Sequence, residues 1–259
     1  MRVFAVSDIH ADYQENLKWV VDISKQEYQE DVLIVAGDVS DSLLVLEHIF
    51  VLLLERFRVV LFVPGNHDLW VVRDGALNSL EKFHAVMELA KKLGVVTSPY
   101  RIGDTEIFPL LSWYDYSFGA PSNALRSIWA DYHACTWPNQ ITDYDLSRYF
   151  DGQNDCYHSE YRPKIITFSH FLPRIDIMPS YIPNRYRQLY PVFGSDRTDL
   201  QIRRLSSKMH IYGHSHLNRD VVIEGVRYIN NAFAYPRETN IALKALLKVS
   251  DVNFGYFDK

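Results

Sequence analysis

Residues 59–68, VVLFVPGNHD, pass from five apolar residues through a Pro-Gly pair into three adjacent polar ones. An apolar run without alternation is typical of a strand buried on both faces of a sheet. The Pro-Gly pair favours a sharp turn, which would deliver Asn66, His67 and Asp68 to one edge of that sheet. Such residues are common in turns, so the rest of the chain must decide whether they also form a site.

The size and composition of the chain limit the class of protein to which it can belong. It has 259 residues, of which 47% are hydrophobic, and a formal net charge of -5. With no linker or composition shift, this favours a globular protein with a single domain over residues 1–259. Charges of both signs are interspersed, which argues against binding of duplex nucleic acid. Short apolar runs and the lack of an export signal predict no membrane association and a cytoplasmic protein, with Cys135 and Cys156 as reduced thiols.

The first half of the chain alternates strand-like and helix-like segments. The apolar pattern predicts strands over 2–7, 32–36 and 59–63, and helices over 16–28, 42–56 and 81–93. This order predicts a sheet of parallel strands covered by helices, in which ligands bind beyond the carboxyl ends of the strands.

The second half predicts another, mixed sheet, so the fold class is α/β. Its expected strands are 106–111, 164–168 and 209–212, a hairpin of 221–224 with 226–229, and two further strands at 243–249 and 252–257, the first of which could be helical. An aromatic-rich insertion at about 112–161 interrupts the pattern.

Polar side chains follow five of the predicted strands. They are Asp8 and His10, then Asp38, then Asn66 with His67 and Asp68, then His170, and finally His214 and His216. Taken singly, each has an ordinary explanation as a turn residue, a helix cap or a core histidine. Because the carboxyl ends of such strands converge on one edge, their joint occurrence predicts a metal site.

The types of ligand indicate which metals could bind. Imidazole and carboxylate groups with one amide oxygen suit transition metals, with Mn, Fe or Zn as the leading candidates. Seven ligating side chains are too many for one ion with an open position. Two divalent or trivalent ions about 3.5–4 Å apart, sharing a carboxylate, account for that number.

With these residues, the sequence resembles the calcineurin-like metallophosphoesterases over residues 1 to about 235. The five blocks of that family read D-x-H, G-D, G-N-H-[DE], H and G-H-x-H. They stand here in order as Asp8 and His10, Gly37-Asp38, Gly65-Asn66-His67-Asp68, His170, and Gly213-His214-Ser215-His216. The resemblance implies a four-layer α/β/β/α sandwich with two mixed β-sheets.

The resemblance also implies a role for each residue. Asp8, His10 and His216 would hold one ion, Asn66, His170 and His214 the other, and Asp38 would bridge the two. A metal-bridging hydroxide would attack phosphorus in line. His67 would be catalytic, binding the phosphate or protonating the leaving oxygen, and Asp68 would orient its imidazole.

The expected function is hydrolysis of a small phosphate ester, which could be nucleotide-like. The motifs leave phosphomonoester, phosphodiester and diphosphate substrates open, and the sequence does not predict an oligomeric state. The alternative is a catalytically silent metal-binding scaffold for protein–protein interaction. The intact set of ligands argues against that alternative.

Two variable regions suggest further hypotheses. The insertion holds 12 aromatic residues, which could form a lid over the site or, as we favour, a small aromatic core. Arg174, Arg185 and Arg187 lie in a Pro-containing loop over 172–191. They could clamp a distal phosphate, although solvated surface arginines are the commoner case.

Overall fold

The computed structural model describes residues 1–75, 78–138, 141–159 and 164–254. The strands in this part of the chain are β1 (Arg2–Val6), β2 (Val32–Ala36), β3 (Val59–Val63), β4 (Tyr100–Ile102), β5 (Thr105–Pro109), β6 (Lys164–Phe168), β7 (Met209–Tyr212), β8 (Arg219–Ile223), β9 (Val226–Asn230) and β10 (Leu247–Asp251). The α-helices are α1 (Gln14–Asp22), α2 (Leu43–Leu54), α3 (Ser79–Leu93), α4 (Asn123–Ile128), α5 (Asp131–Ala134), α6 (Asp143–Gln153), α7 (Asn184–Arg187) and α8 (Asp196–Arg204).

The strands form two mixed sheets, as predicted. The first has the order β10-β1-β2-β3, in which β1, β2 and β3 are parallel and β10 is antiparallel to β1. The second has the order β4-β5-β6-β7-β9-β8, with β5, β6, β7 and β9 parallel and an antiparallel strand at each edge. The parallel strands of both sheets therefore present their carboxyl ends as a group.

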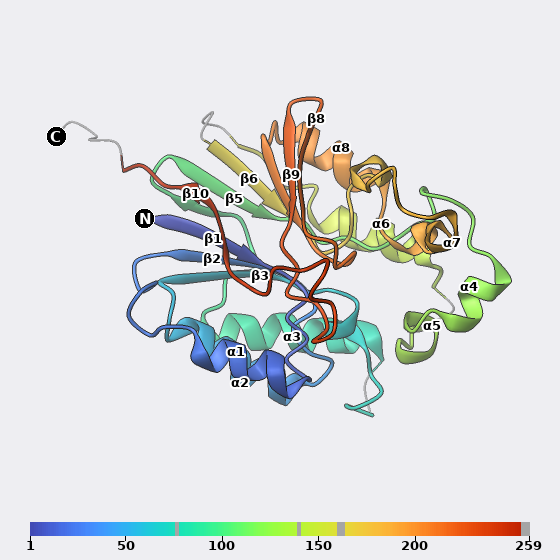
Figure 1. Cartoon of the computed structure of the whole chain (residues 1–259), viewed down its shortest axis with the longest axis horizontal. Coiled ribbons are helices and arrows are strands. Elements are labelled where there is room, and N and C mark those ends of the chain that lie inside the picture. Colours follow the sequence, from blue (N-terminus) through green and yellow to red (C-terminus); the bar gives the residue numbers. More distant parts are fainter. Residues whose placement is uncertain (76–77, 139–140, 160–163, 255–259) are drawn as a thin grey trace.

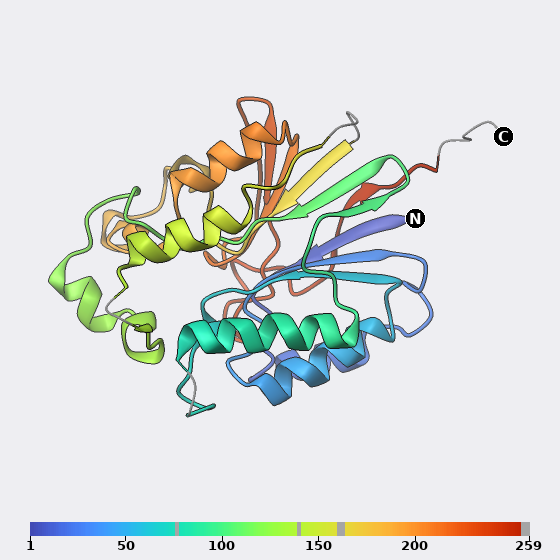
Figure 2. The same cartoon turned by 180° about the vertical axis from the view of Figure 1, so that it is seen from behind.

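Four layers result from the two faces of each sheet (Figures 1 and 2). Alternate strand residues point to opposite faces, so β2 places Ile34 in the core between the sheets and Leu33 and Val35 in the core under the helices. Helices α1, α2 and α3 cover the first sheet, while α6 and α8 cover the second (Figure 2). The predicted α/β/β/α sandwich is confirmed.

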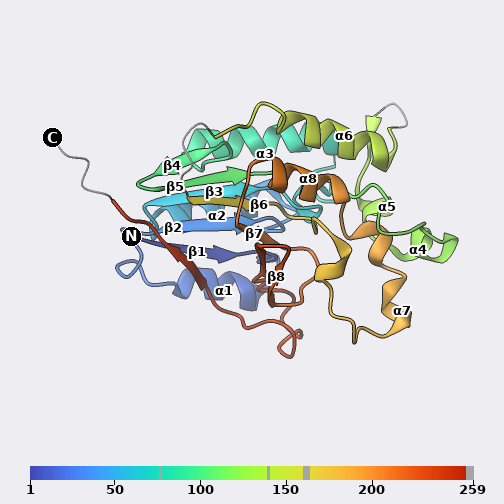
Figure 3. The same cartoon turned by 90° about the horizontal axis from the view of Figure 1, so that it is seen from above.

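The short helices lie apart from these layers. Helices α4, α5 and α7 gather at the end of the molecule that lies away from the N-terminus (Figures 1 and 3). The parallel strands of the first sheet point toward this same end. Helices α4 and α5 belong to the insertion, whose helices the sequence pattern did not predict.

Three predicted elements differ from the structure by more than two residues at an end. The helix expected over 16–28 ends at Asp22, because the backbone of Ile23 (φ -57°, ψ 132°) is no longer helical and the Ser24 hydroxyl accepts turn hydrogen bonds from the N–H groups of Gln26 and Glu27. At the other end of the chain, β10 replaces the strand predicted over 243–249. Residues 252–254 form no strand, and the rest of the segment predicted over 252–257 lies outside the described residues.

A buried lysine connects helix α3 to the loops beside the strand ends. Lys82 is fully buried, pairs with Asp74, and donates to the carbonyl oxygens of Asp41 and Trp70. Buried polar groups are costly when they lack partners. Lys82 therefore holds the segment that carries Trp70.

We expect Lys82→Met to lower the free energy of unfolding by about 3 kcal/mol. The substitution removes the ammonium group, so the Asp74 carboxylate and the two carbonyl oxygens lose their donor. Chemical denaturation measures this change. Lys91→Met is the matched control, because Lys91 is exposed on the same helix; it should change stability by no more than about 0.5 kcal/mol. Equal stability of the two variants would contradict the role given to Lys82.

Candidate metal centre

The loops after β1, β2, β3, β6 and β7 meet at one edge of the sheets, and backbone hydrogen bonds join them. The Asp8 N–H donates to the Gly37 carbonyl (2.9 Å), and the His10 N–H donates to the Asp38 carbonyl (3.0 Å). The Gly213 N–H donates in the same way to the His170 carbonyl (2.8 Å). The predicted ligands thus stand on a connected set of loops.

Unusual backbone conformations concentrate in these loops. Positive φ angles occur at Asp8 (51°), His10 (44°), Asp38 (55°), His214 (67°) and His216 (53°). Residues with a Cβ rarely adopt this region, and they remain there only where the surroundings fix them. Five predicted ligands are therefore held in conformations that a free loop would avoid.

One group of candidate ligands comes from both ends of the chain. Asp8, His10 and His216 each bring one possible ligand atom within 4.8 Å of the others. The Nε2 atoms of His10 and His216 are 3.0 Å apart, and His216 Nε2 lies 3.3 Å from Asp8 Oδ1. All three residues are buried or nearly so.

A second group lies beside the first. It contains Asp38, His170 and His214. Asn66 Oδ1 is 3.0 Å from both His170 Nε2 and His214 Nδ1, which are themselves 3.1 Å apart. His170 Nε2 also lies 3.4 Å from Asp38 Oδ2. Every predicted ligand is therefore brought to this edge.

Asp38 belongs to more than one group. It also lies within 4.8 Å of His10 and His67 in a third arrangement of possible ligand atoms. Its carboxylate is thus placed between the His10 side and the His170 side of the centre. A shared carboxylate in this position is what the bridging role requires.

The packing of the ligand atoms fits metal ions. Each close pair of ring nitrogens needs a proton between the two atoms, whereas a cation would be attracted to all the lone pairs at once. Neutral imidazole, carboxylate and amide oxygen form a donor set for transition metals. The residues present could therefore hold such ions.

Two glycines make this close packing possible. A Cβ atom on Gly65 would lie 2.1 Å from Asp38 Oδ1, and one on Gly37 would lie 2.6 Å from His170 Nδ1. Gly37 also has a φ of 80°, which favours glycine. The glycines of G-D and G-N-H-D are explained by their close approach to the side chains of the candidate ligands Asp38 and His170.

Asp68 has a different set of partners from the predicted one. Its carboxylate accepts four backbone hydrogen bonds of 2.8–3.0 Å, from the N–H groups of Gly65, Asp38, Val39 and Ser40. No described hydrogen bond joins it to the imidazole of His67, which we expected it to orient. The short helical turn at His67–Leu69 directs Asp68 into the protein, where it joins the loops after β2 and β3.

His67 is held instead by aromatic residues. Its ring stacks on Trp70 with centroids 3.5 Å apart, and its Nε2 lies 3.3 Å from the hydroxyl of Tyr235. Its backbone N–H donates to Asp38 Oδ1 (2.9 Å). The imidazole therefore stays beside the two ligand groups.

The insertion contributes a carboxylate that the sequence analysis missed. Asp131 of α5 is buried, and its Oδ1 accepts from Asn66 Nδ2 and Trp70 Nε1, both at 2.8 Å. Its Oδ2 accepts from Trp129 Nε1 (2.8 Å). Because the NH₂ group of Asn66 is engaged in this way, its amide oxygen faces the centre.

Glu238 supports the other group, and it was also missed. Its Oε2 accepts from the backbone N–H of Tyr235 (2.9 Å) and lies 2.7 Å from His216 Nδ1. Such partners orient metal-binding histidines and fix their tautomer. Nothing in the spacing of Asp131 or Glu238 along the chain marks either residue, because both contacts depend on the tertiary fold.

The aromatic residues of the insertion mostly form a core. Trp113 is 1% exposed and packs against Trp137 and Phe171, with centroids 5.2 and 5.0 Å away. This supports the aromatic core over the lid for that residue. Among the aromatic residues of the insertion, Trp129 lies beside the centre, with its ring 5.7 Å from that of His214.

The three arginines of the 172–191 loop have protein partners. Arg174 pairs with Asp176 and Glu224. Arg187 donates to backbone carbonyls within its own loop, and Arg185 contacts the neighbouring Tyr186. These contacts favour structural roles over a phosphate clamp.

The charges of the centre shift its pKa values strongly. Burial disfavours the charged form of His216, but Asp8 and Glu238 raise its pKa to about 10. In the same way, Asp38 and Asp8 outweigh burial and raise the pKa of His170 to about 9. Burial lowers the pKa of His214 to about 3. Without metal, two protons therefore supply positive charge where cations are expected.

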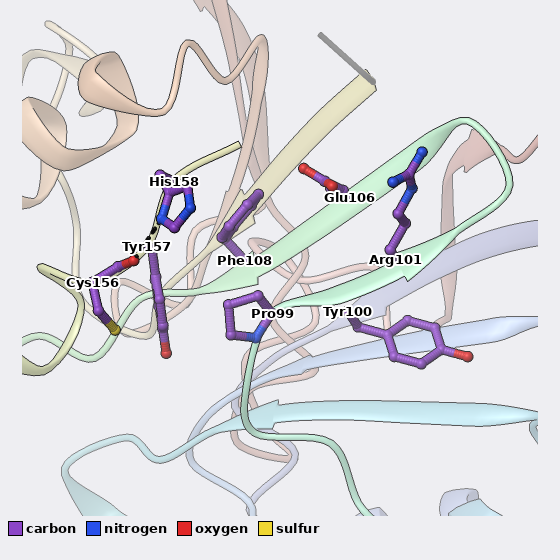
Figure 4. A pocket seen from close by; sticks show the side chains of 8 residues that line it. All are labelled: Pro99, Tyr100, Arg101, Glu106, Phe108, Cys156, Tyr157 and His158. Atoms are coloured by element: carbon purple, nitrogen blue, oxygen red, sulfur yellow. Dashed lines mark hydrogen bonds between the residues drawn. The ribbon is translucent and has the colours of Figure 1, made fainter. Parts of the chain in front are cut away.

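The described cavities lie outside this cluster of ligands. One, of about 390 Å³, lies along β4 and β5 and residues 156–158; it is lined by Pro99, Tyr100, Arg101, Glu106, Phe108, Cys156, Tyr157 and His158 (Figure 4). Another, of about 520 Å³, borders the centre through Tyr235 and Glu238. The second cavity provides space next to the candidate ligands.

We expect Asp131→Asn to weaken metal binding about tenfold, since the amide of Asn66 loses the partner that orients it. Titration calorimetry with Mn²⁺ or Zn²⁺ measures the effect. Asp143→Asn is the matched control, because Asp143 also accepts from an indole of the insertion, that of Trp113, without contacting the centre. Equal affinities for the two variants would contradict the role of Asp131.

Metal binding should release protons from His170 and His216. With pKa values raised to about 9 and about 10, both imidazoles are protonated near pH 7 in the metal-free protein and must lose their protons to become ligands. Apparent affinity should therefore rise as the pH increases toward those values. Calorimetry in two buffers of different ionisation enthalpy counts the protons released, and a count of zero at pH 7 would refute this expectation.

No helix in the described part of the chain is long and apolar enough to span a membrane. Comparison with known proteins then bears on the family. The model of the calcineurin-like phosphoesterase family matches residues 1–218, which include every predicted ligand.

A relative named PptH matches this chain both in sequence and in structure. The chain is 28% identical over 261 residues to the [acyl-carrier-protein] phosphodiesterase PptH of Mycobacterium tuberculosis, covering 91% of this chain and 78% of that protein. The crystal structure of phosphopantetheinyl hydrolase (PptH) from the same organism matches with a TM-score of 0.80 at 23% identity, over 96% of this chain and 95% of that one. The second likeness concerns the fold. Since the family model spans most of the sequence and all the strand-end motifs, this chain belongs to the calcineurin-like phosphoesterase family and is a phosphoesterase.

Proposed function

We propose that this phosphoesterase is a two-metal hydrolase of phosphodiesters. The observation that carries the proposal is that two groups of candidate metal ligands lie side by side, with Asp38 in one group and within 4.8 Å of His10 in the other. A single carboxylate between two such groups suits a pair of ions that share one substrate phosphate. Mn, Fe or Zn ions suit the imidazole-rich donor set.

In this proposal each side chain has one task. Asp8, His10 and His216 hold one ion, Asn66, His170 and His214 hold the other, and Asp38 contacts both. When bound, the ions would acidify a water molecule and stabilise negative charge on the phosphoryl oxygens. Asp131 and Glu238 orient Asn66 and His216 through the hydrogen bonds described above.

His67 is proposed as the residue that meets the leaving oxygen. Its imidazole lies among the candidate ligands, and Trp70 and Tyr235 already hold it. Because His67 holds neither ion in this proposal, it can donate a proton without loss of a metal ligand. Asp68 supports it indirectly, by fixing the loop of Asp38, which accepts from the His67 backbone.

The relative suggests the class of substrate. Because PptH is named an [acyl-carrier-protein] phosphodiesterase and a phosphopantetheinyl hydrolase, we propose a phosphopantetheinyl group esterified to a protein as the substrate of this chain. Free Cys135 and Cys156 agree with the proposed cytoplasmic location. Intact ligand groups and membership of an enzyme family disfavour the alternative of a silent scaffold.

The test begins with metal analysis of the purified protein, followed by turnover with added Mn²⁺. We expect two metals per chain, hydrolysis of bis-p-nitrophenyl phosphate, and removal of the prosthetic group from a phosphopantetheinylated carrier protein, read as a loss of mass. Hydrolysis of the small diester alone would refute the carrier-protein substrate. No hydrolysis despite two bound metals would favour the scaffold.

We expect His67→Ala to retain metal content near that of the wild type and to lose activity by about 10²–10⁴-fold, the usual worth of a proton donor. Elemental analysis and steady-state kinetics on one preparation measure both quantities. His84→Ala is the control, because His84 lies on α3 away from the strand ends. Loss of metal from His67→Ala would make His67 a ligand instead.

A further inference from the structure

The segment after β9 is fixed against the first strand-end loop. The N–H groups of Phe233 and Ala234 donate to the carbonyl oxygens of Ser7 and Asp8, both at 2.8 Å. From the other side, the buried Asn16 donates to the Ala234 carbonyl (3.0 Å). Ala234 has a φ of 63°, a conformation that these bonds hold in place. Tyr235, the next residue, is thereby placed beside the centre.

The ring of Tyr235 covers one side of the centre. It stacks on His10 with centroids 4.5 Å apart and an interplanar angle of 30°. It meets His216 edge-on, at 4.8 Å. Lys244 donates to the Tyr235 carbonyl (2.6 Å), and Glu238 accepts from its N–H group, so the backbone is fixed as well. The hydroxyl therefore has a defined position.

That hydroxyl faces the imidazole of His67. Among the described residues it is the only group that hydrogen-bonds the His67 ring, with 3.3 Å between the oxygen and Nε2. The nearest carboxylate oxygen, Asp38 Oδ2, is 3.9 Å from the same nitrogen. Stacking on Trp70 fixes the plane of the ring but not which ring edge faces the centre. The Tyr235 hydroxyl supplies that second restraint.

We propose that Tyr235 is a positioning residue that acts through His67 on the leaving group. This inference rests on the proposed phosphodiesterase function. The single Nε2–H of protonated His67 is shared between the Tyr235 hydroxyl oxygen and the leaving oxygen, and it passes to the leaving oxygen as the bond from phosphorus breaks. The Tyr235 hydroxyl, which accepted from the protonated nitrogen, rotates to donate to the bare one and keeps its own proton. His67 thus stays bonded in both protonation states.

The test compares two diesters that differ in how much their leaving groups need a proton. Phenol leaves poorly without protonation, whereas p-nitrophenol leaves readily as an anion. For Tyr235→Phe we expect kcat to fall about tenfold on diphenyl phosphate, the worth of one hydrogen bond. On bis-p-nitrophenyl phosphate it should change less than about twofold. KM and metal content should match those of the wild type.

Tyr13→Phe is the matched control. Its ring contacts that of Tyr235 at 5.6 Å, while its hydroxyl has no described bond to His67. It should hydrolyse both esters like the wild type. In a His67→Ala background, Tyr235→Phe should cause no further loss, because a residue that acts through His67 has nothing left to position. Equal loss on both esters, or an undiminished loss in that background, would overturn the proposal.

A spectroscopic measurement separates this inference from the proposed function. In metal-free protein, Tyr235→Phe should shift the ¹⁵N resonance of His67 Nε2, since the nitrogen loses its hydrogen-bond partner, and Tyr13→Phe should not. An unchanged resonance would refute the role of Tyr235 whatever the activity. A shifted resonance in a protein that hydrolyses no ester would refute the proposed function and leave the positioning contact supported.

Discussion

The geometry of the centre depends most on the hydrogen bonds that the carboxylate of Asp68 accepts. By accepting four backbone hydrogen bonds, it ties the turn after β3 to the loop after β2. Asp38 lies in the loop after β2 and His67 in the turn after β3. The four hydrogen bonds therefore fix the distance between these two residues. Burial and the nearby Asp38 raise the pKa of Asp68 to about 7, while its backbone donors favour the ionised form. A carboxylate can accept from several donors at once, which explains why this position is occupied by Asp and not by a neutral residue.

Much of this arrangement could be predicted from the sequence, for a physical reason. Strands β2, β3, β6 and β7 were placed at their observed bounds, because buried runs with sharp ends have a clear pattern. Once their order indicated parallel pairing, the polar residues that follow them had to gather at one edge. The resemblance to a known family then gave each residue a role, and the structure brings all seven predicted ligands to that edge.

The remaining features depend on tertiary contacts that a linear pattern does not encode. Asp131 reaches Asn66 across 65 residues, and Tyr235 reaches His67 across 168. Asp68 was assigned to the wrong neighbour because adjacency in the chain says nothing of side-chain direction: the helical turn points Asp68 inward and His67 toward the centre. The short helices of the insertion were missed since aromatic residues are no strong helix formers and pack there by tertiary contact.

The pairing of Asp8 with residues near the other end of the chain has a consequence for the order of assembly. Asp8 follows β1, whereas its neighbours His216 and Ala234 come more than 200 residues later in the chain, and β10, which pairs with β1, comes later still. The early ligands therefore have no complete site while the chain is still growing. A chain synthesised only as far as β7 would lack His216, so under the proposed two-metal function the group around Asp8 could bind its ion only after more than 200 residues beyond Asp8 had been added.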